Sequence, residues 1–210
     1  MIISRTPLRI PLGGGSTDLP SYYSKFGGFI FGVAVNLYMH VGLRQTISDS
    51  VRLVGRTIEE VPTIQALSHP IAKAVLQRIS PQGGLEVVSL SDVPEGTGMG
   101  SSGAFTVGLL GAVCGFQQLN VLPRFLAQEA CGVLMDELRL PEGKQDPYLT
   151  ALGGFQAFHI ASDGGITLEK FSLSKETVAA FEANTLLFYT GAQRSSHDIL
   201  REQEQKTVAK

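Results

Sequence analysis

A glycine-rich stretch at residues 94–104 carries the strongest chemical signal in the sequence. It reads Pro94-Glu95-Gly96-Thr97-Gly98-Met99-Gly100-Ser101-Ser102-Gly103-Ala104. Glycine lets backbone N–H groups point inward at φ values that other residues avoid, and a helix that begins near Ser101 would add unpaired N–H groups and a positive dipole end. These features predict a cradle for an anion, first of all a nucleotide phosphate, with serine hydroxyls beside it that could hold Mg²⁺. The simpler alternative is a strand-to-helix turn in which Ser101 is the N-cap.

The same glycines also fit a different nucleotide site. Gly98, Gly100 and Gly103 spell G-x-G-x-x-G after a predicted strand at 85–90, as in the dinucleotide-binding turn of Rossmann-type oxidoreductases. That function needs a parallel sheet and an acidic ribose ligand about twenty residues past the glycines, and this chain has no acidic residue there. No lysine follows the glycines, as one would in a P-loop. A redox function is therefore the weaker alternative.

A polar loop at residues 141–148 is the second candidate site. Within it Lys144 stands two residues before Asp146, between Gly143 and Pro147. A positive charge beside a carboxylate keeps that carboxylate ionised. In phosphoryl transfer such an aspartate can accept the proton of the attacking hydroxyl or orient that hydroxyl. The structural alternative is a turn in which Asp146 acts as a cap before Pro147.

Three consecutive glycines near the N-terminus form the third candidate site. Gly13, Gly14 and Gly15 would allow the backbone to approach a ligand closely, and Asp18 just beyond them could accept hydrogen bonds from hydroxyl groups. The local pattern fits equally well a glycine-rich turn in which Asp18 caps a short helix at 19–23.

Taken in order, these stretches resemble the motifs of the GHMP kinases, a family that includes galactokinase, homoserine kinase and mevalonate kinase. The segments Thr-Pro-Leu-Arg-Ile, Gly-Gly-Gly-Ser-Thr-Asp and Gly-Lys-Gln-Asp-x-Tyr, the last followed by Ala-Leu-Gly-Gly-Phe, look most like the D-glycero-D-manno-heptose 7-phosphate kinase branch. The resemblance covers essentially the whole chain. It implies transfer of the γ-phosphoryl group of ATP, with Mg²⁺, to a hydroxyl of a sugar or sugar phosphate, with the heptose 7-phosphate as the first candidate.

The resemblance also implies roles for individual residues. Asp146 would be the catalytic base, and Arg9 would stabilise the charge that develops on the transferred phosphoryl group. The residues that would bind ATP are Pro94, Gly96, Gly98, Met99, Gly100, Ser101, Ser102 and Gly103. The residues that would contact the sugar are Gly14, Gly15, Thr17, Asp18, Lys144, Tyr148 and Gly154.

The resemblance places magnesium near Ser102 and Asp136. In sugar kinases of this family a glutamate on the helix that corresponds to residues 124–138 helps to hold Mg²⁺, and Leu134 stands at that place in this chain. Asp136, half a turn later, is the nearest carboxylate. An acidic residue at the end of a helix is explained equally well by simple exposure to water.

Composition limits the class of protein. Of the 210 residues, 43% are hydrophobic and 17% are charged, and the formal net charge is −2. These values are typical of a soluble globular protein and favour neither nucleic acid nor an anionic membrane as a partner. We expect a cytoplasmic protein with a small-molecule substrate, for which a homodimer is a compatible assembly. Cys114 and Cys131 should be buried, unreactive thiols, and His40 and His69 lack metal-ligand spacing.

Periodicity and turn residues predict an α+β fold. We expect a first domain at residues 1–153, with a mixed sheet and helices in the GHMP manner, and the start of a second domain at 154–210. The predicted strands are 1–10 (broken by Pro7), 29–47 (two strands with a bend near Gly42), 51–54, 85–90, 155–160, 166–173 and 184–189. The predicted helices are 69–79, 101–116, 124–138 and 197–210.

A third, glycine-rich motif of the family has no counterpart after Tyr189. We therefore expect a C-terminally truncated chain. A second class of function follows from this expectation and from Leu134, namely a relative that binds nucleotide or sugar without turnover.

Overall fold

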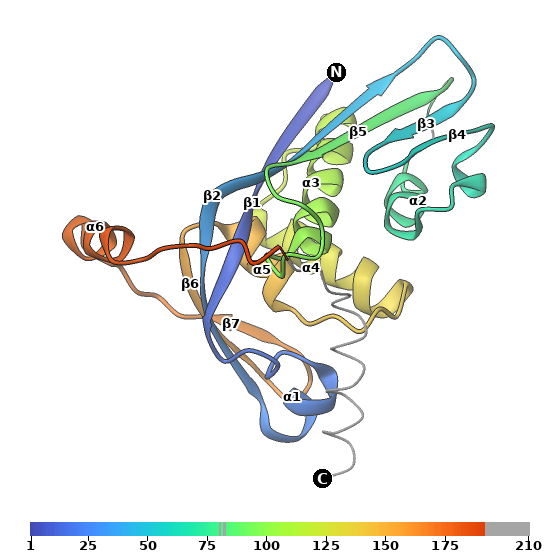
Figure 1. The fold of residues 1–210 in the computed structure, drawn as a ribbon. Helices are drawn as coiled ribbons and strands as arrows, with labels where there is room; N and C mark the ends of the chain where they lie inside the picture. Colours follow the sequence, from blue (N-terminus) through green and yellow to red (C-terminus); the bar gives the residue numbers. More distant parts are fainter. Residues whose placement is uncertain (80, 82, 192–210) are drawn as a thin grey trace.

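The computed structural model describes residues 1–79, 81 and 83–191, and these form a mixed α+β fold (Figure 1). One seven-stranded sheet runs in the order β4-β3-β5-β2-β6-β7, and β1 pairs with β2 beside this path. Among the strands of the described residues only β3 and β5 pair in parallel, so this is not the parallel sheet that a dinucleotide-binding fold requires. The strands are β1 (Ile2–Gly13), β2 (Gly28–Gln45), β3 (Val51–Val54), β4 (Ile58–Val61), β5 (Leu85–Ser91), β6 (Phe155–Ile160) and β7 (Ile166–Leu168).

Strand β2 is the longest strand and organises the sheet. Its N-terminal half pairs with β6, its C-terminal half pairs with β5, and β1 runs antiparallel along its other edge. The prediction of two strands with a bend near Gly42 is wrong, because Gly42 pairs with Ile3 on one side and Val88 on the other and is held extended by both. The break predicted at Pro7 is also wrong. In this edge strand Pro7 causes only a shift of register before Arg9.

The helices lie on both sides of the sheet. Helices α2 to α5 gather on one side and α6 lies on the other (Figure 1). Helix α3 is apolar nearly all round, as expected of a helix buried between a sheet and other helices. Gly108 lets α3 approach β1 closely, and there the Ser4 hydroxyl donates to the Gly108 carbonyl over 2.6 Å. The helices are α1 (Pro20–Phe26), α2 (Pro70–Leu76), α3 (Ser101–Phe116), α4 (Pro123–Cys131), α5 (Gln145–Leu152) and α6 (Lys175–Ala183), with the short helices η1 (Ile64–Ala66) and η2 (Gly132–Glu137).

Several elements differ from the sequence prediction. The helix predicted at 124–138 is α4 followed by the π-helical turn η2, and the strand predicted at 166–173 ends at Leu168. The strand predicted at 184–189 is wrong: no described strand pairs with it, and its apolar side chains, such as Leu186 and Phe188, are exposed. Strand β4 and helices α5 and α6 were not predicted, and α5 begins within the predicted loop at 141–148. The helix predicted at 197–210 lies outside the described residues.

Two expectations about the core and the surface can be compared with the structure. Cys114 and Cys131 are free and buried, as predicted, and burial raises the pKa of the Cys131 thiol to about 12. No helix among the described residues is long and apolar enough to cross a bilayer. The boundary proposed at residue 153 lies between α5 and β6, and β6 pairs with β2 in the same sheet. The two-domain division stays a prediction.

Candidate active site

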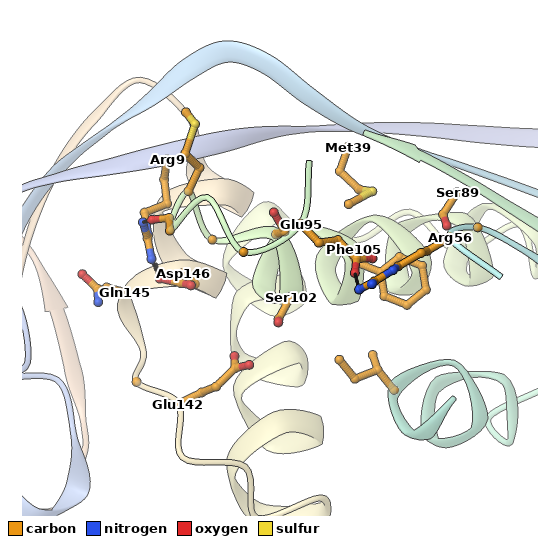
Figure 2. Close-up of a pocket in the computed structure, with 18 of the residues that line it drawn as sticks. Arg9, Met39, Arg56, Ser89, Glu95, Ser102, Phe105, Glu142, Gln145 and Asp146 are labelled. Atoms are coloured by element: carbon orange, nitrogen blue, oxygen red, sulfur yellow. Dashed lines mark hydrogen bonds and ion pairs between the residues drawn. The ribbon is translucent and has the colours of Figure 1, made fainter. Parts of the chain in front are cut away.

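A cavity of about 720 Å³ opens above the N-terminus of α3 (Figure 2). Its volume lies in the range of pockets that hold small molecules. Three of the predicted stretches meet in its wall: Arg9 and Gly15 from the N-terminal segment, the glycine-rich stretch, and the loop at 142–146. The remaining wall comes from strands β3 and β5, the turn after β3 and the start of α2. The fold thus brings together residues that are more than 100 positions apart in the chain.

The glycine-rich stretch forms a loop that ends as the cap of α3. Gly96, Gly98 and Gly100 all have φ near +76°, a region that side chains strongly disfavour. Gly100 is itself the N-cap of α3, in the left-handed conformation, so the alternative in which Ser101 is the N-cap is wrong. No side chain caps this helix, so its first N–H groups are available to bind a ligand in the cavity. That arrangement suits a phosphate group.

Arg9 fastens this loop to the rest of the site. Its backbone N–H donates to Met99, its Nη1 donates to the Gly98 carbonyl over 2.7 Å, and its Nε donates to Oδ1 of Asp146 over 2.7 Å. A second guanidinium nitrogen, Nη2, lies 2.5 Å from the same Oδ1. The side chain of Arg9 is only 8% exposed. A single guanidinium group therefore holds the glycine loop and the α5 carboxylate in one fixed arrangement.

Asp146 lies in the first turn of α5, against glycines of the glycine-rich stretch (Figure 2). A Cβ atom on Gly103 would lie 2.6 Å from Cβ of Asp146, and one on Gly100 would lie 3.2 Å from Oδ2. Both glycines are needed for this close approach. The sequence interpretation paired Asp146 with the charge of Lys144, and this is wrong, because Lys144 donates to the Gly164 carbonyl and lies over the ring of Tyr23. The charge partner of Asp146 is Arg9.

Asp18 lies behind the cavity wall. It is 1% exposed, is not one of the cavity-lining residues, and its Oδ2 accepts the Gln145 N–H over 2.9 Å. Burial, reinforced by the charge of Asp146, raises the pKa of Asp18 to about 6, although the Gln145 N–H opposes this rise. The alternative in which Asp18 caps a helix at 19–23 is wrong, because the N-cap of α1 is Leu19 and no side chain caps that helix.

The other N-terminal residues hold the glycine turn in place. The Thr17 hydroxyl lies within hydrogen-bond distance of the Gly14 and Phe29 carbonyls and accepts the Phe29 N–H over 3.0 Å. Gly14 has φ +80°, and a Cβ there would overlap the Phe29 carbonyl oxygen. Only Gly15 of the predicted sugar-contacting residues lines the cavity.

The remaining predicted sugar contacts lie away from the cavity wall. Tyr148 is buried among apolar residues, where its ring packs against Phe158 with centroids 5.4 Å apart. The Gly154 carbonyl accepts the Ala34 N–H over 2.9 Å, beside the start of β6. Of the predicted nucleotide-binding residues, Pro94 and Gly103 do not line the cavity, whereas the other six do.

The two predicted magnesium ligands are separated in the structure. Ser102 lines the cavity, whereas Asp136 is exposed on η2 and is not one of the lining residues. Leu134, where the resemblance places a glutamate, is fully buried in the core. Glu142, which is 6% exposed, lines the cavity instead, and Figure 2 shows its carboxylate directed toward Ser102. The described residues contain no cluster of three or more His, Cys, Asp or Glu side chains that could hold a metal by itself. A hydroxyl and one carboxylate fit a magnesium ion that also binds phosphates.

The end of the cavity far from Arg9 was not predicted as part of the site. Arg56 lies there and its Nη1 is 3.5 Å from Glu95, and Ser89, Phe105 and His69 complete the wall. His69 caps α2 by accepting the Ala72 N–H, and burial lowers the pKa of its ring. No short-range pattern marks these residues, because they come from a turn, a strand and two helix ends. Glu142 could have been found as an acidic residue within the second candidate loop.

An α+β fold with a glycine-rich loop at the start of a helix, beside an aspartate held by an arginine, is an arrangement that can bind a phosphate group next to a pair of charged side chains. Residues 66–154 match the model of the GHMP kinases N terminal domain. This match covers the glycine-rich stretch and the loop that contains Asp146, and it agrees with the resemblance that the motifs predicted.

Relatives with known sequences or structures support the same assignment. A D-glycero-alpha-D-manno-heptose 7-phosphate kinase from Campylobacter jejuni is 26% identical over 94% of this chain and 62% of its own length. An L-fucokinase/L-fucose-1-P guanylyltransferase from Bacteroides fragilis is 25% identical over 96% of this chain and 25% of its own length. The crystal structure of a D-glycero-D-manno-heptose 1-phosphate kinase from Bacteroides thetaiotaomicron aligns with a TM-score of 0.81 and 22% identity, over all of this chain and 71% of that one. The chain thus spans about three fifths of the heptose 7-phosphate kinase and a quarter of the bifunctional enzyme.

Proposed function

We propose that this protein transfers the γ-phosphoryl group of ATP to a hydroxyl of a sugar or sugar phosphate, with D-glycero-D-manno-heptose 7-phosphate as the first candidate substrate. The observation that carries the proposal is the Arg9–Asp146 pair, which lies against the uncapped start of α3 in one cavity. The first candidate substrate follows from the heptose 7-phosphate kinase relative.

In the proposed reaction Asp146 accepts the proton of the attacking sugar hydroxyl. The hydroxyl oxygen forms a bond to the γ-phosphorus, the bond from that phosphorus to the β-phosphate bridge oxygen breaks, and ADP leaves. Both guanidinium contacts go to Oδ1 of Asp146, whereas Oδ2 lies beside Gly100 at the phosphate loop. The guanidinium group orients the Asp146 carboxylate and places a positive charge where negative charge develops on the phosphoryl group.

Magnesium would be held by Ser102 and Glu142 together with the nucleotide. When bound, the ion neutralises charge on the β- and γ-phosphates. The other contributions come from the chain itself: the N–H groups of α3 bind phosphate, Arg9 fixes the geometry, and the cavity wall limits access of water.

The second candidate function is binding of nucleotide or sugar without turnover. The observation that favours it is Leu134, whose fully buried side chain leaves no helix carboxylate at the place where the resemblance expects a metal ligand. The two functions differ in whether ATP is consumed.

The test is ADP release from MgATP with the heptose 7-phosphate, beside galactose and fucose, for the wild-type chain and the Asp146→Asn variant. The proposed function predicts turnover that the variant loses by roughly 10²- to 10⁴-fold. A thermal shift with MgATP but no turnover with any sugar would support the second function. The absence of both turnover and binding would contradict both functions.

A further inference from the structure

Asp18 caps a helix that begins 127 residues later in the chain. No side chain of α5 itself caps that helix, and its N-cap is Lys144. The first N–H of the helix, that of Gln145, instead donates to Oδ2 of Asp18 over 2.9 Å. A carboxylate at this position satisfies a helix N–H and interacts favourably with the positive end of the helix dipole. The next residue of the helix is Asp146.

Gly143 is shaped to admit this carboxylate. A Cβ atom on Gly143 would lie 1.9 Å from Oδ2 and 2.4 Å from Cγ of Asp18. No side chain can occupy that space while Asp18 stays in place. The loop that leads into α5 therefore passes directly over the Asp18 carboxylate because residue 143 is glycine.

The backbone next to Asp18 is held in place by hydrogen bonds of Thr17. The preceding residue, Thr17, is bonded to Gly14 and to Phe29 of β2, as described above. The Asp18 side chain is almost completely buried, and its Oδ1 has no hydrogen-bond partner among the described residues. Asp146 and Arg9 are the charged groups whose fields reach it most strongly. Burying a carboxylate near another carboxylate lowers the free energy of unfolding. Asp18 therefore needs a role that offsets this loss of stability.

We propose that Asp18 is a positioning residue that holds the first turn of α5, and with it the Asp146 carboxylate, in register with Arg9 and the phosphate loop. Its effect on turnover rests on the proposed function, whereas its effect on α5 does not. This role differs from the direct sugar contact that the sequence resemblance implied, because Asp18 acts here through Gln145 and Gly143.

The experiment compares full-length Asp18→Ala, which removes the acceptor, with Asp18→Asn, which keeps an acceptor oxygen for the Gln145 N–H. We expect kcat of the alanine variant to fall roughly 10- to 100-fold, because small displacements of a catalytic group have effects of this size. The KM values for ATP and sugar should stay the same, and amide hydrogen exchange at 145–149 should become faster. The asparagine variant should keep most of the wild-type kcat and protection.

Two further variants separate positioning from general stability. Gly143→Ala should reproduce the defect of Asp18→Ala in the wild-type background and add little to it in the double variant, because the three atoms nearest to the added methyl group all belong to the Asp18 carboxylate. Ser174→Ala is the matched control, since the Ser174 hydroxyl caps α6 far from the cavity by accepting the Thr177 N–H. It should lower the thermal midpoint without changing kcat.

Several results would overturn the proposal. A raised KM for the sugar with unchanged kcat in Asp18→Ala would make Asp18 a direct sugar contact. Equal defects in Asp18→Ala and Asp18→Asn would show that the acceptor oxygen is unimportant. If the wild-type chain has no turnover, the proposed function fails and hydrogen exchange alone decides: unchanged exchange at 145–149 in Asp18→Ala would then refute the positioning role, and faster exchange there would support it.

Discussion

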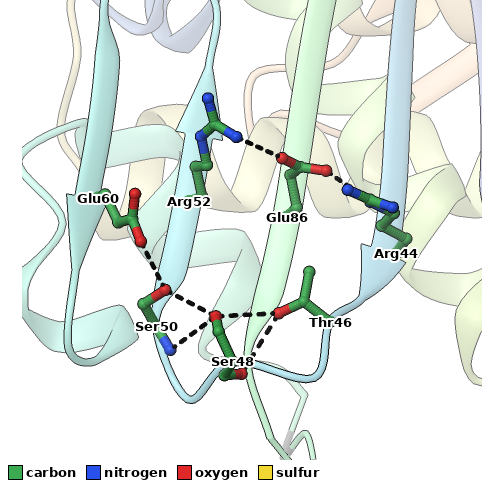
Figure 3. Close-up of polar contacts among 7 residues, drawn as sticks. All are labelled: Arg44, Thr46, Ser48, Ser50, Arg52, Glu60 and Glu86. Carbon is green, nitrogen blue, oxygen red and sulfur yellow. Dashed lines mark hydrogen bonds and ion pairs between the residues drawn. The ribbon is translucent and has the colours of Figure 1, made fainter.

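Two arginine–carboxylate contacts in this protein have the same shortest distance, 2.5 Å, but join different kinds of neighbours. Glu86 of β5 accepts from Arg44 of β2 and Arg52 of β3, which are its direct partners in the adjacent strands (Figure 3). Both arginines are about half exposed. Asp146 and Arg9, by contrast, join a helix start to a strand, and both are largely buried at the cavity wall.

The difference separates a structural contact, that of Glu86, from the contact between Arg9 and Asp146 that we propose to be catalytic. The contacts of Glu86 follow from strand register, and each strand would pair without them. The Arg9–Asp146 contact is supported by features with no other evident purpose: two glycines that clear space for Asp146, a carbonyl that orients Arg9, and a distant carboxylate that caps α5. The candidate site is therefore marked by the number of residues that fix the position of Arg9 and Asp146, rather than by the strength of the ion pair.

The largest effect in this comparison is expected when Arg9 is replaced by lysine, and Arg44→Lys is the matched control. Arg9→Lys should lower turnover roughly 10²- to 10³-fold, because an ammonium group cannot make the forked contact with Asp146 and also reach Gly98. Arg44→Lys should leave turnover unchanged. The measurement is steady-state ADP release for both variants, with circular dichroism to confirm folding. Equal losses in the two variants would remove the distinction between the two contacts.

The second effect is a pH dependence of stability that comes from Asp18. Its pKa rises from 3.8 to about 6 on folding, so the native state binds more protons than the unfolded state between these values. The free energy of unfolding therefore falls as pH rises through this window, by up to about 3 kcal/mol. Asp18→Asn lacks this titration. In denaturant titrations, the unfolding free energy of Asp18→Asn minus that of wild type should increase between pH 4 and pH 7. A difference that stays constant with pH would contradict a raised pKa of Asp18 in the folded state.

A third, smaller effect concerns the metal. Glu142→Gln should weaken Mn²⁺ binding to the ADP complex roughly 10- to 100-fold, because one of few protein ligands is lost. Asp136→Asn is the matched control and should bind Mn²⁺ like wild type, since Asp136 lies outside the cavity wall. Electron paramagnetic resonance of free Mn²⁺ measures both affinities. The reverse result would return the metal to Asp136, as the sequence suggested.

The smallest effect is expected for the contacts of Glu86 with Arg44 and Arg52. Glu86→Gln should lower the free energy of unfolding by about 1 kcal/mol or less, because both arginine partners are half exposed and screened by water. Turnover should not change. Thermal unfolding at low and high salt tests this, and the difference from wild type should shrink as salt is added. A loss of turnover would mean that the outer face of the sheet also serves the site.

Local pattern was enough to predict much of this fold and part of the site. The glycine-rich stretch, the helix after it and the second candidate loop stand out because their residue types have strong local preferences. Asp146 and Arg9 were predicted as separate residues, from the resemblance. Their direct contact could not be predicted, because it depends on how α5 packs against β1, and Lys144 offered a nearer positive charge in the sequence.

The failures have a common physical cause. Gly42 was predicted to bend the chain, but pairing on both sides keeps it extended. Residues 184–189 have the composition of a strand, yet in the described structure they find no partner. The alternative in which Asp18 caps its own helix is wrong, because Asp18 instead accepts an N–H of a helix from a distant segment. In each case long-range contacts override local preference.

The most direct test of the central claim is ADP release from MgATP and the heptose 7-phosphate, measured side by side for wild type, Asp146→Asn and Glu86→Gln. Both variants remove one charge from a short arginine–carboxylate contact and keep the size of the side chain. We expect that Asp146→Asn stays folded but loses turnover, whereas Glu86→Gln keeps the wild-type rate. Wild-type turnover by Asp146→Asn would contradict the central claim.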